Sequence, residues 1–304
     1  MMIIRQSVRW LAANIHVGRG LLRTVDADVP SFYRQFPLPR KGKDPRLIDR
    51  PLPPLRLIQD GIKDNLLVSF PFPHELHGSI RGRSPQTNAR AHGKTPLLVN
   101  IDLEKFYPSV TCDMVIAVWK NAFGFGPAIA TLLTRLTTHC GHVPQGAPTS
   151  GYLANIVLLP AANEIRAIAA ALGCTVTFYV DDISISGARA REAIEPIVAV
   201  LARHGLRIGR DKTKVMPAHS AQTITGQTIN CGRPSVSRRK RDSVSELIHE
   251  LKLRRRLGQD VSRLRASIEG RIAHIRFTNP GHAQRLSAQL LRVAGPRRKA
   301  VQVH

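Results

Sequence analysis

The sequence predicts an α+β fold, in which short antiparallel strands lie beside long helices. Residues 176–185 alternate apolar and polar side chains on both sides of an adjacent pair of aspartates, which is typical of two half-buried strands joined as a hairpin. Residues 96–101 form an apolar run typical of a buried strand. Residues 150–172, by contrast, repeat apolar side chains at helical spacing.

Three carboxylates are placed at the ends of these strands. Asp102 follows the first strand directly, whereas Asp181 and Asp182 are expected at the tip of the hairpin. Neighbouring anions repel one another unless a cation lies between them, and hard cations such as Mg²⁺ take oxygen ligands. Three such groups meet the needs of two ions that bridge a nucleotide triphosphate and a primer hydroxyl. An isolated Asp-Asp pair is more often a polar turn, so the third carboxylate is what favours a metal site.

Between the strands, residues 143–155 form a turn rich in Gly and Pro that opens an apolar helix. In this order, the aspartate strand, the turn and the hairpin resemble the three central motifs of reverse transcriptases. Two further segments, residues 88–92 and 224–226, resemble marks of the bacterial retron enzymes. The residues that carry these marks are Asn88, His92, Thr225 and Gly226.

The composition favours a nucleic-acid partner. The 304 residues carry 45 Lys and Arg against 21 Asp and Glu, a formal net charge of +24, which indicates a polyanionic partner. A basic structural protein would not need three carboxylates at strand ends. The four cysteines lack the close pairs of zinc sites, which suits reduced thiols and a cytoplasmic location. No uninterrupted apolar run of about eighteen residues occurs, so we expect no membrane partner.

The resemblance implies a right-hand polymerase with fingers, a palm of antiparallel sheet plus helices, and a helical thumb. We expect the fingers at residues 1–95 and 111–144, the catalytic palm at 96–110 and 145–232, and a basic thumb and tail at 233–304. This last segment holds 18 Lys and Arg against 5 Asp and Glu, over half of the net charge. Within it, the capping-box spacing of Ser243 and Glu246 predicts the start of a helix, and an apolar stripe over residues 261–275 predicts a second one.

The resemblance also assigns catalytic roles. Asp102, Asp181 and Asp182 would be catalytic and, with the carbonyl group of Leu103, would hold two Mg²⁺ ions, with Mn²⁺ as the alternative metal. Lys212, or else Lys214, could protonate the leaving pyrophosphate.

The residues expected to contact the incoming deoxynucleoside triphosphate are Lys41, Arg46, Tyr107, Gln145 and Tyr179. The two basic residues belong to a predicted hairpin, residues 33–51, that can fold over a triphosphate, although a basic turn can also simply face solvent. The ring of Tyr107 would leave no room for a 2′-hydroxyl group and would so select deoxynucleotides.

RNA contacts are expected from Arg81, Arg83, Arg254, Arg255 and Arg256, the first two in a glycine-rich finger motif and the others in the thumb. The expected partners are a cognate structured noncoding RNA, its DNA product, deoxynucleoside triphosphates and an effector protein encoded nearby.

The expected function is that of a retron-type RNA-directed DNA polymerase, which copies this RNA into a small single-stranded DNA branched from the RNA, as part of an anti-phage defence system. One alternative is a reverse transcriptase of another bacterial lineage, such as a group II intron relative or another defence-associated type. The other is a non-catalytic RNA-binding protein on a polymerase fold, against which Asp102, Asp181, Asp182 and Gln145 argue. Primer extension in Mg²⁺ separates these classes.

Overall fold

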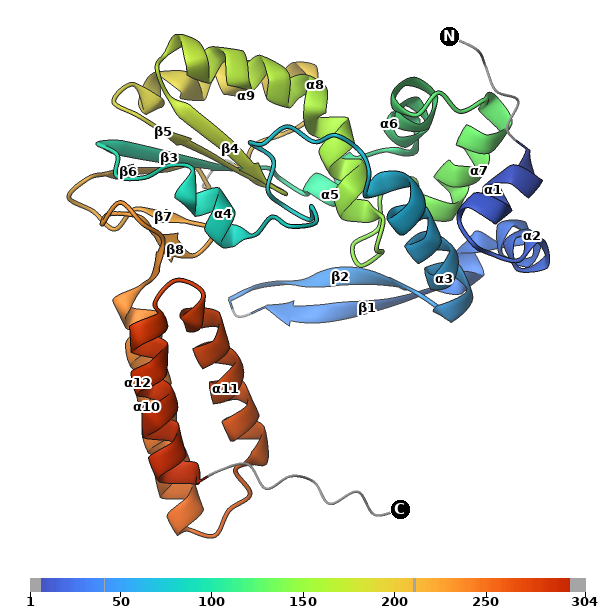
Figure 1. The fold of residues 1–304 in the computed structure, drawn as a ribbon. Helices are drawn as coiled ribbons and strands as arrows, with labels where there is room; N and C mark the ends of the chain where they lie inside the picture. The colour runs from blue at the N-terminus through green and yellow to red at the C-terminus, as the bar shows by residue number, and fades with distance from the viewer. Residues whose placement is uncertain (1–6, 41, 210–211, 296–304) are drawn as a thin grey trace.

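The computed structural model describes residues 7–40, 42–209 and 212–295. It confirms the predicted α+β class, because a four-stranded sheet lies beside helices and a long hairpin, and a separate helical bundle follows toward the C-terminus (Figure 1). Lys41, predicted to contact the nucleotide, lies outside the described residues.

The central sheet is antiparallel, with the strand order β4-β5-β3-β6. Its strands are β3 (Leu97–Asp102), β4 (Thr175–Tyr179), β5 (Asp182–Ser186) and β6 (Lys214–Pro217). The predicted aspartate strand and the predicted hairpin are therefore both present, and they are neighbours in one sheet.

Side chains alternate between the two faces of this sheet, as they must in extended strands. Ile101 opposes Ile183 and Val99 opposes Ile185, and all four side chains are fully buried on one face. The opposite face carries mostly polar side chains, which are Asn100, Asp102, Thr177, Asp182, Ser184 and Ser186. The alternation thus separates an apolar core face from a polar face that bears the aspartates.

Each face has its own cover (Figure 1). The apolar face packs against α8 (Ser150–Ala171) and α9 (Ile194–Arg203). The polar face packs against α4 and a small sheet, whose bounds are α4 (Pro85–Arg90), β7 (Thr223–Ile224), β8 (Gln227–Thr228) and β9 (Ser235–Val236). By length and composition α8 alone among the described helices could cross a membrane, but half of its most apolar window is buried, as in a core helix.

Residues 223–228 form a tight hairpin, β7–β8, which turns at Thr225 and Gly226. Both turn residues have positive φ angles, 44° and 79°. A two-residue hairpin turn of type I′ requires this conformation at both central positions.

Helices and a hairpin pack beside the sheet. Their bounds are α1 (Val8–Asn14), α2 (Arg19–Ala27), α3 (Pro53–Ile62), α5 (Phe106–Ser109), α6 (Cys112–Ala117), α7 (Pro127–Thr137), β1 (Tyr33–Arg40) and β2 (Lys43–Pro51). The predicted basic hairpin is therefore confirmed. A π-turn over Lys63–Leu67 follows α3, and it buries Leu67.

The C-terminal bundle has three helices and its own apolar core. They are α10 (Arg238–Arg256), α11 (Ser262–Arg276) and α12 (Pro280–Ala294). The start predicted at Ser243 was wrong: Ser237 caps α10 by accepting the Lys240 N–H, and Ser243 lies inside the helix with its hydroxyl on the Lys240 carbonyl. Such back-bonding is how a mid-helix serine satisfies its hydroxyl.

Candidate active site

The three predicted carboxylates meet at one end of the central sheet. Asp102 and Asp182 are direct cross-strand partners in β3 and β5, and Asp181 occupies the β4–β5 turn beside them. A backbone hydrogen bond of 2.8 Å from the Leu103 N–H to the Asp181 carbonyl joins the turn to the end of β3. Because opposed residues share a face of the sheet, Asp102 and Asp182 project to the same side.

The turn between β4 and β5 is tightly constrained. Val180 has a φ angle of 57°, which is unusual for a β-branched residue. Gly78 lies against this turn so closely that a Cβ atom on it would be 2.4 Å from the Val180 nitrogen. The His77 N–H also donates to the Phe178 carbonyl at 2.7 Å. The loop before α4 therefore supports the turn that carries Asp181.

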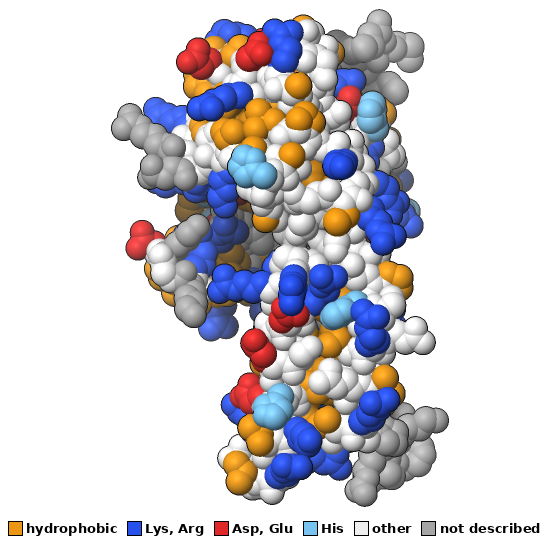
Figure 2. Space-filling model, turned by 90° about the vertical axis from the view of Figure 1, so that its left-hand side faces the viewer, with side chains coloured by type: hydrophobic (Ala, Val, Ile, Leu, Met, Phe, Trp, Pro, Cys, Tyr) orange, Lys and Arg blue, Asp and Glu red, His pale blue; other side chains and the backbone are white. Residues whose placement is uncertain are grey.

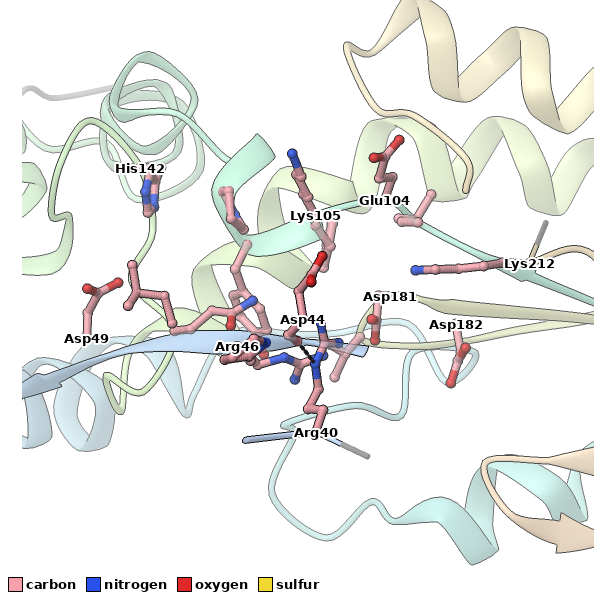
Figure 3. A pocket seen from close by; sticks show the side chains of 18 of the residues that line it. Arg40, Asp44, Arg46, Asp49, Glu104, Lys105, His142, Asp181, Asp182 and Lys212 are labelled. Atoms are coloured by element: carbon pink, nitrogen blue, oxygen red, sulfur yellow. Dashed lines mark hydrogen bonds between the residues drawn. The ribbon is translucent and has the colours of Figure 1, made fainter. Parts of the chain in front are cut away.

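Asp181 and Asp182 line a cleft of about 1010 Å³ (Figure 3). It is bounded by the central sheet, the β1–β2 hairpin and the α5 segment. Every described residue predicted to contact the nucleotide lines this cleft, namely Arg46, Tyr107, Gln145 and Tyr179. The structure thus brings together groups that are far apart in the sequence.

Two aromatic residues at the start of α5 divide their roles. Both line the cleft, but Phe106 is 3% exposed and belongs to the core, whereas Tyr107 is only partly buried against it. Burial raises the pKa of Tyr107, and a hydrogen bond with Ser79 opposes that shift. The phenol is therefore neutral and held in place at neutral pH.

The electrostatics of the cleft are those of crowded anions. Burial first, and then the charges of Asp181 and Asp102, raise the pKa of Asp182 to about 6. Burial also raises the pKa of Asp181. Lys212 supplies the opposing charge, because its Nζ pairs with Oδ1 of Asp102. Lys212 lines the cleft and Lys214 does not, which favours Lys212 as the proton donor.

The donor set fits hard divalent cations, since it consists of carboxylate oxygens whose charges are only partly compensated. Yet within the described ranges no three His, Cys, Asp or Glu side chains are grouped so as to hold an ion. Lys212 forms an ion pair with Asp102, so that carboxylate already faces one positive charge of the protein. The predicted ligand set of Asp102, Leu103, Asp181 and Asp182 stays a prediction.

Comparison with known proteins identifies the family. Residues 38–230 match the family described as reverse transcriptase (RNA-dependent DNA polymerase). The retron Mx65 reverse transcriptase of Myxococcus xanthus is 31% identical, over 91% of this chain and 69% of that protein. The chain belongs to the retron-type reverse transcriptases. The retron Mx162 enzyme of the same organism is also 31% identical, over 87% of this chain and 61% of that protein. The retron Ec86 enzyme of Escherichia coli is 27% identical, over 72% and 70%.

The match shows that this reverse transcriptase has a palm-type polymerase fold. Family membership also makes the chain an RNA-directed DNA polymerase. The chain spans between 61% and 70% of the length of the three relatives named above. The C-terminal bundle lies beyond the residues matched by the family.

The retron-marking residues meet on the polar face of the sheet. Asn88 and His92 are 1% and 6% exposed, and His92 contacts Thr177 and Ser186 of the catalytic hairpin. The Thr225 hydroxyl donates to the Pro85 carbonyl at the start of α4. In the sequence, these marks lie before and after the three central motifs. In the fold, Asn88 belongs to α4 and Thr225 contacts the first residue of the same helix.

The two finger arginines differ in their surroundings. The Arg83 guanidinium donates three of its five N–H groups to the carbonyl groups of Phe72, Pro73 and Leu76. These hydrogen bonds hold Arg83 against the protein, and RNA binding by this residue stays a prediction. Arg81 is exposed, and its RNA contact stays a prediction.

The supporting role of the loop at residues 74–79 was not predicted from the sequence. Gly78 in this loop lies against the β4–β5 turn. Ser79 was also not predicted, although it forms a hydrogen bond with Tyr107 and lies against Gly151. The available signal was the glycine itself, which marks a close backbone approach without saying to what.

Arginine side chains make part of the surface of the C-terminal bundle basic. Arg254 pairs with Glu250, and Arg255 donates to the Val293 carbonyl. A groove of about 650 Å³ between α10 and α12 is lined by Lys252, Arg255, Arg256 and Arg292 among others. Figure 2 shows Lys and Arg side chains gathered on the C-terminal part of the molecule. RNA binding by these residues stays a prediction.

Burial of His92 predicts a pH-dependent stability. Burial, with a smaller contribution from His77, lowers the pKa of His92 to about 4. Between pH 4 and 6.5 the unfolded chain therefore binds a proton that the native protein does not, so this residue lowers the free energy of unfolding as the pH falls, by up to about 1.4 kcal/mol per pH unit. Urea unfolding of the wild type and His92→Gln measures the effect as a difference between their pH slopes. Parallel slopes would contradict the buried, neutral ring.

Proposed function

We propose that this reverse transcriptase copies a cognate structured noncoding RNA into a small single-stranded DNA that stays branched from the RNA. The observation that carries the proposal is that Asp181 and Asp182 line one cleft with Arg46 and Tyr107, and that Asp102 is the cross-strand partner of Asp182. The chain is related over most of its length to retron enzymes. The overall form would be a right hand, with the β1–β2 hairpin in the fingers and the C-terminal bundle as the thumb.

The cleft residues divide the work of nucleotide addition. Two Mg²⁺ ions, held by the three aspartates and the Leu103 carbonyl, would neutralise the triphosphate and lower the pKa of the primer hydroxyl. Arg46 would bind the phosphates, and Tyr107 would exclude a 2′-hydroxyl group from the incoming nucleotide. Lys212 would leave Asp102 and donate a proton to the departing pyrophosphate.

The primer in this proposal is a 2′-hydroxyl of a guanosine within the folded RNA, which yields a 2′,5′ branch. Chemically, nucleotidyl transfer needs only a hydroxyl held in line with the α-phosphate, and a clamped RNA can present a 2′ oxygen as well as a 3′ one. Tyr107 does not forbid this, because it screens the incoming nucleotide and not the primer. The RNA would be recognised by its stem shape and unpaired loops.

The proposal includes an anti-phage defence role with an effector protein encoded nearby, in the cytoplasm. The four described cysteines are all free, which suits a reducing compartment. The defence role and the effector protein are proposed from the resemblance to retron reverse transcriptases.

The enzyme assignment is tested by primer extension in Mg²⁺ on an RNA template with deoxynucleotides. The proposal predicts extension, and it predicts far weaker extension with ribonucleotides because of Tyr107. RNA binding without any extension would favour the alternative, a non-catalytic RNA-binding protein on a polymerase fold. When the chain is expressed with its neighbouring noncoding RNA and no added primer, linear products begun only from 3′ ends would favour a reverse transcriptase of another bacterial lineage.

Neutralising the bundle should weaken the salt dependence of RNA binding. Each phosphate contact contributes roughly 0.7–0.9 to the steepness of log affinity against log salt. Replacing Arg254, Arg255 and Arg256 by Gln should therefore reduce this steepness by about 2. The control makes the same charge change at Arg9, Arg19 and Arg23 on α1 and α2. Filter binding at several salt concentrations measures both. An equal loss in the control would mean that net charge alone, and not the bundle, sets the slope.

A further inference from the structure

The segment of residues 85–92 connects parts of the protein that lie far apart in the sequence. Its helix α4 packs against β4 of the catalytic hairpin and against β7 and β8 of the small sheet. Figure 1 shows α4 between the central sheet and the β7–β8 hairpin. The segment does not line the active-site cleft beyond Pro85.

His92 joins the two strands of the catalytic hairpin. Its Nδ1 lies 2.8 Å from the Ser186 hydroxyl oxygen on β5, and its Nε2 lies 2.7 Å from the Thr177 hydroxyl oxygen on β4. Thr177 opposes Ser184, so the ring spans a diagonal between the strands. Burial keeps the ring neutral at pH 7, so one nitrogen donates a hydrogen bond and the other accepts one.

The bridge lies on the face of the sheet that carries the catalytic carboxylates. On β5, Asp182, Ser184 and Ser186 follow one another on this face, because side chains two residues apart point the same way. Through its two hydroxyl partners, His92 therefore restrains sliding between β4 and β5, in the half of the hairpin away from the turn that holds Asp181.

The other end of the segment is tied to the base of the C-terminal bundle. The Thr225 hydroxyl donates to the Pro85 carbonyl at 3.2 Å, and Ala89 packs in a small core with Ile224 and Ile229. β8 pairs with β9, whose Val236 N–H donates to Asn279 of the bundle at 2.8 Å. A continuous set of contacts thus runs from the catalytic hairpin to the bundle.

We propose that residues 85–92 form a brace that fixes the catalytic hairpin relative to the β7–β8 hairpin at the base of the bundle, with His92 as a positioning residue for the aspartates. The brace rests on the proposed function, since it assumes that the β4–β5 turn carries catalytic groups. A direct RNA contact by Asn88 and His92 is disfavoured by their burial, at 1% and 6% exposure. The retron marks in this chain are then structural.

The test compares steady-state kinetics of His92→Ala, Thr177→Val and the double variant with the wild type. Each single change should lower kcat by about 10- to 100-fold with KM for deoxynucleotides and RNA affinity unchanged, because misplacement of a reacting group costs up to about 100-fold. The double variant should be no worse than His92→Ala, since both changes break one shared interaction. Thr177→Ser keeps the hydroxyl and should retain kcat. His219→Ala, an exposed histidine, should behave as the wild type.

Other outcomes overturn the brace. Loss of RNA affinity with normal kcat in His92→Ala would make His92 an RNA contact, and lower melting temperature with normal kcat would make it a packing residue only. Additive losses in the double variant would deny the shared interaction. If His92→Ala does not fold, Ser186→Ala, which removes one hydroxyl, replaces it in the same comparison. Asp181→Asn in the same assay tests the proposed function separately, because activity in that variant would refute the catalytic site itself.

Discussion

Replacing any one of Asp102, Asp181 or Asp182 by Asn should reduce DNA synthesis by at least about 10³-fold, because groups that act as one unit lose nearly the whole effect when one is removed. RNA affinity should be unchanged, since phosphate contacts lie elsewhere. Single-turnover extension and filter binding on the same preparations measure the two quantities.

The aspartate variants should also be folded. Burial and the neighbouring anions raise the pKa of Asp182, so its charge is unfavourable in the folded protein and Asp182→Asn should unfold at an equal or higher temperature. Asp113, which lies in the first turn of α6, offers a control aspartate outside the cleft, and Asp113→Asn should extend primers normally. Wild-type-like extension by Asp181→Asn would contradict the catalytic assignment.

Gly78→Ala should have the second-largest effect. The added Cβ atom would lie 2.4 Å from the Val180 nitrogen and 2.5 Å from its Cγ2 atom, distances that only movement of the β4–β5 turn relieves. We expect a loss of about 1–3 kcal/mol in the free energy of unfolding from overpacking, and a fall in kcat of roughly 100-fold from displacement of Asp181.

Gly20 is the matched control for Gly78→Ala. It lies in α2 with no atom within 4 Å of an added Cβ, so Gly20→Ala should stabilise the protein slightly, by up to about 1 kcal/mol, through helix propensity. Urea unfolding and primer extension measure both variants. Normal kcat in Gly78→Ala would mean that the turn tolerates displacement and that the loop does not position Asp181.

The catalytic hairpin was predictable from the sequence because its signals are local. The alternation around Asp181 and Asp182 reports a period of two residues, and β3 is recognisable as an apolar run that ends at Asp102. That these strands pair in one sheet followed from the resemblance to reverse transcriptases, not from the alternation. Local patterns specify strands, whereas strand order depends on contacts between distant segments.

The contacts that position the site were not predictable in this way. Gly78 approaches Val180, Lys212 pairs with Asp102, and His92 reaches Thr177, and each joins segments that have no common local pattern. The same limit applies to Arg83, whose charge suggested a phosphate contact without indicating that three of its N–H groups donate to backbone carbonyl groups. A charged residue or a glycine indicates that a contact is needed at that position. Only the tertiary structure shows which residue forms the other side of the contact.

The start of α10 shows a different limit. Ser243 and Glu246 have the spacing of a capping box, but Ser237 caps the helix six positions earlier. Ser237 and Ser243 are both residues that favour a helix N-terminus. Because Val244 and Ile248 pack in the bundle core, the helix continues through Ser243. Boundaries are therefore less predictable than the existence of a helix.

The most direct test of the account is the structure of the nucleic acid made when the chain is expressed with its neighbouring noncoding RNA. The product is isolated from wild type and from Asp181→Asn, then treated with ribonuclease and with debranching enzyme. We predict a small single-stranded DNA in the wild type only, whose gel mobility shifts on debranching. Linear DNA begun from 3′ ends or from a protein hydroxyl, with no shift on debranching, would contradict priming from a 2′-hydroxyl group within the RNA.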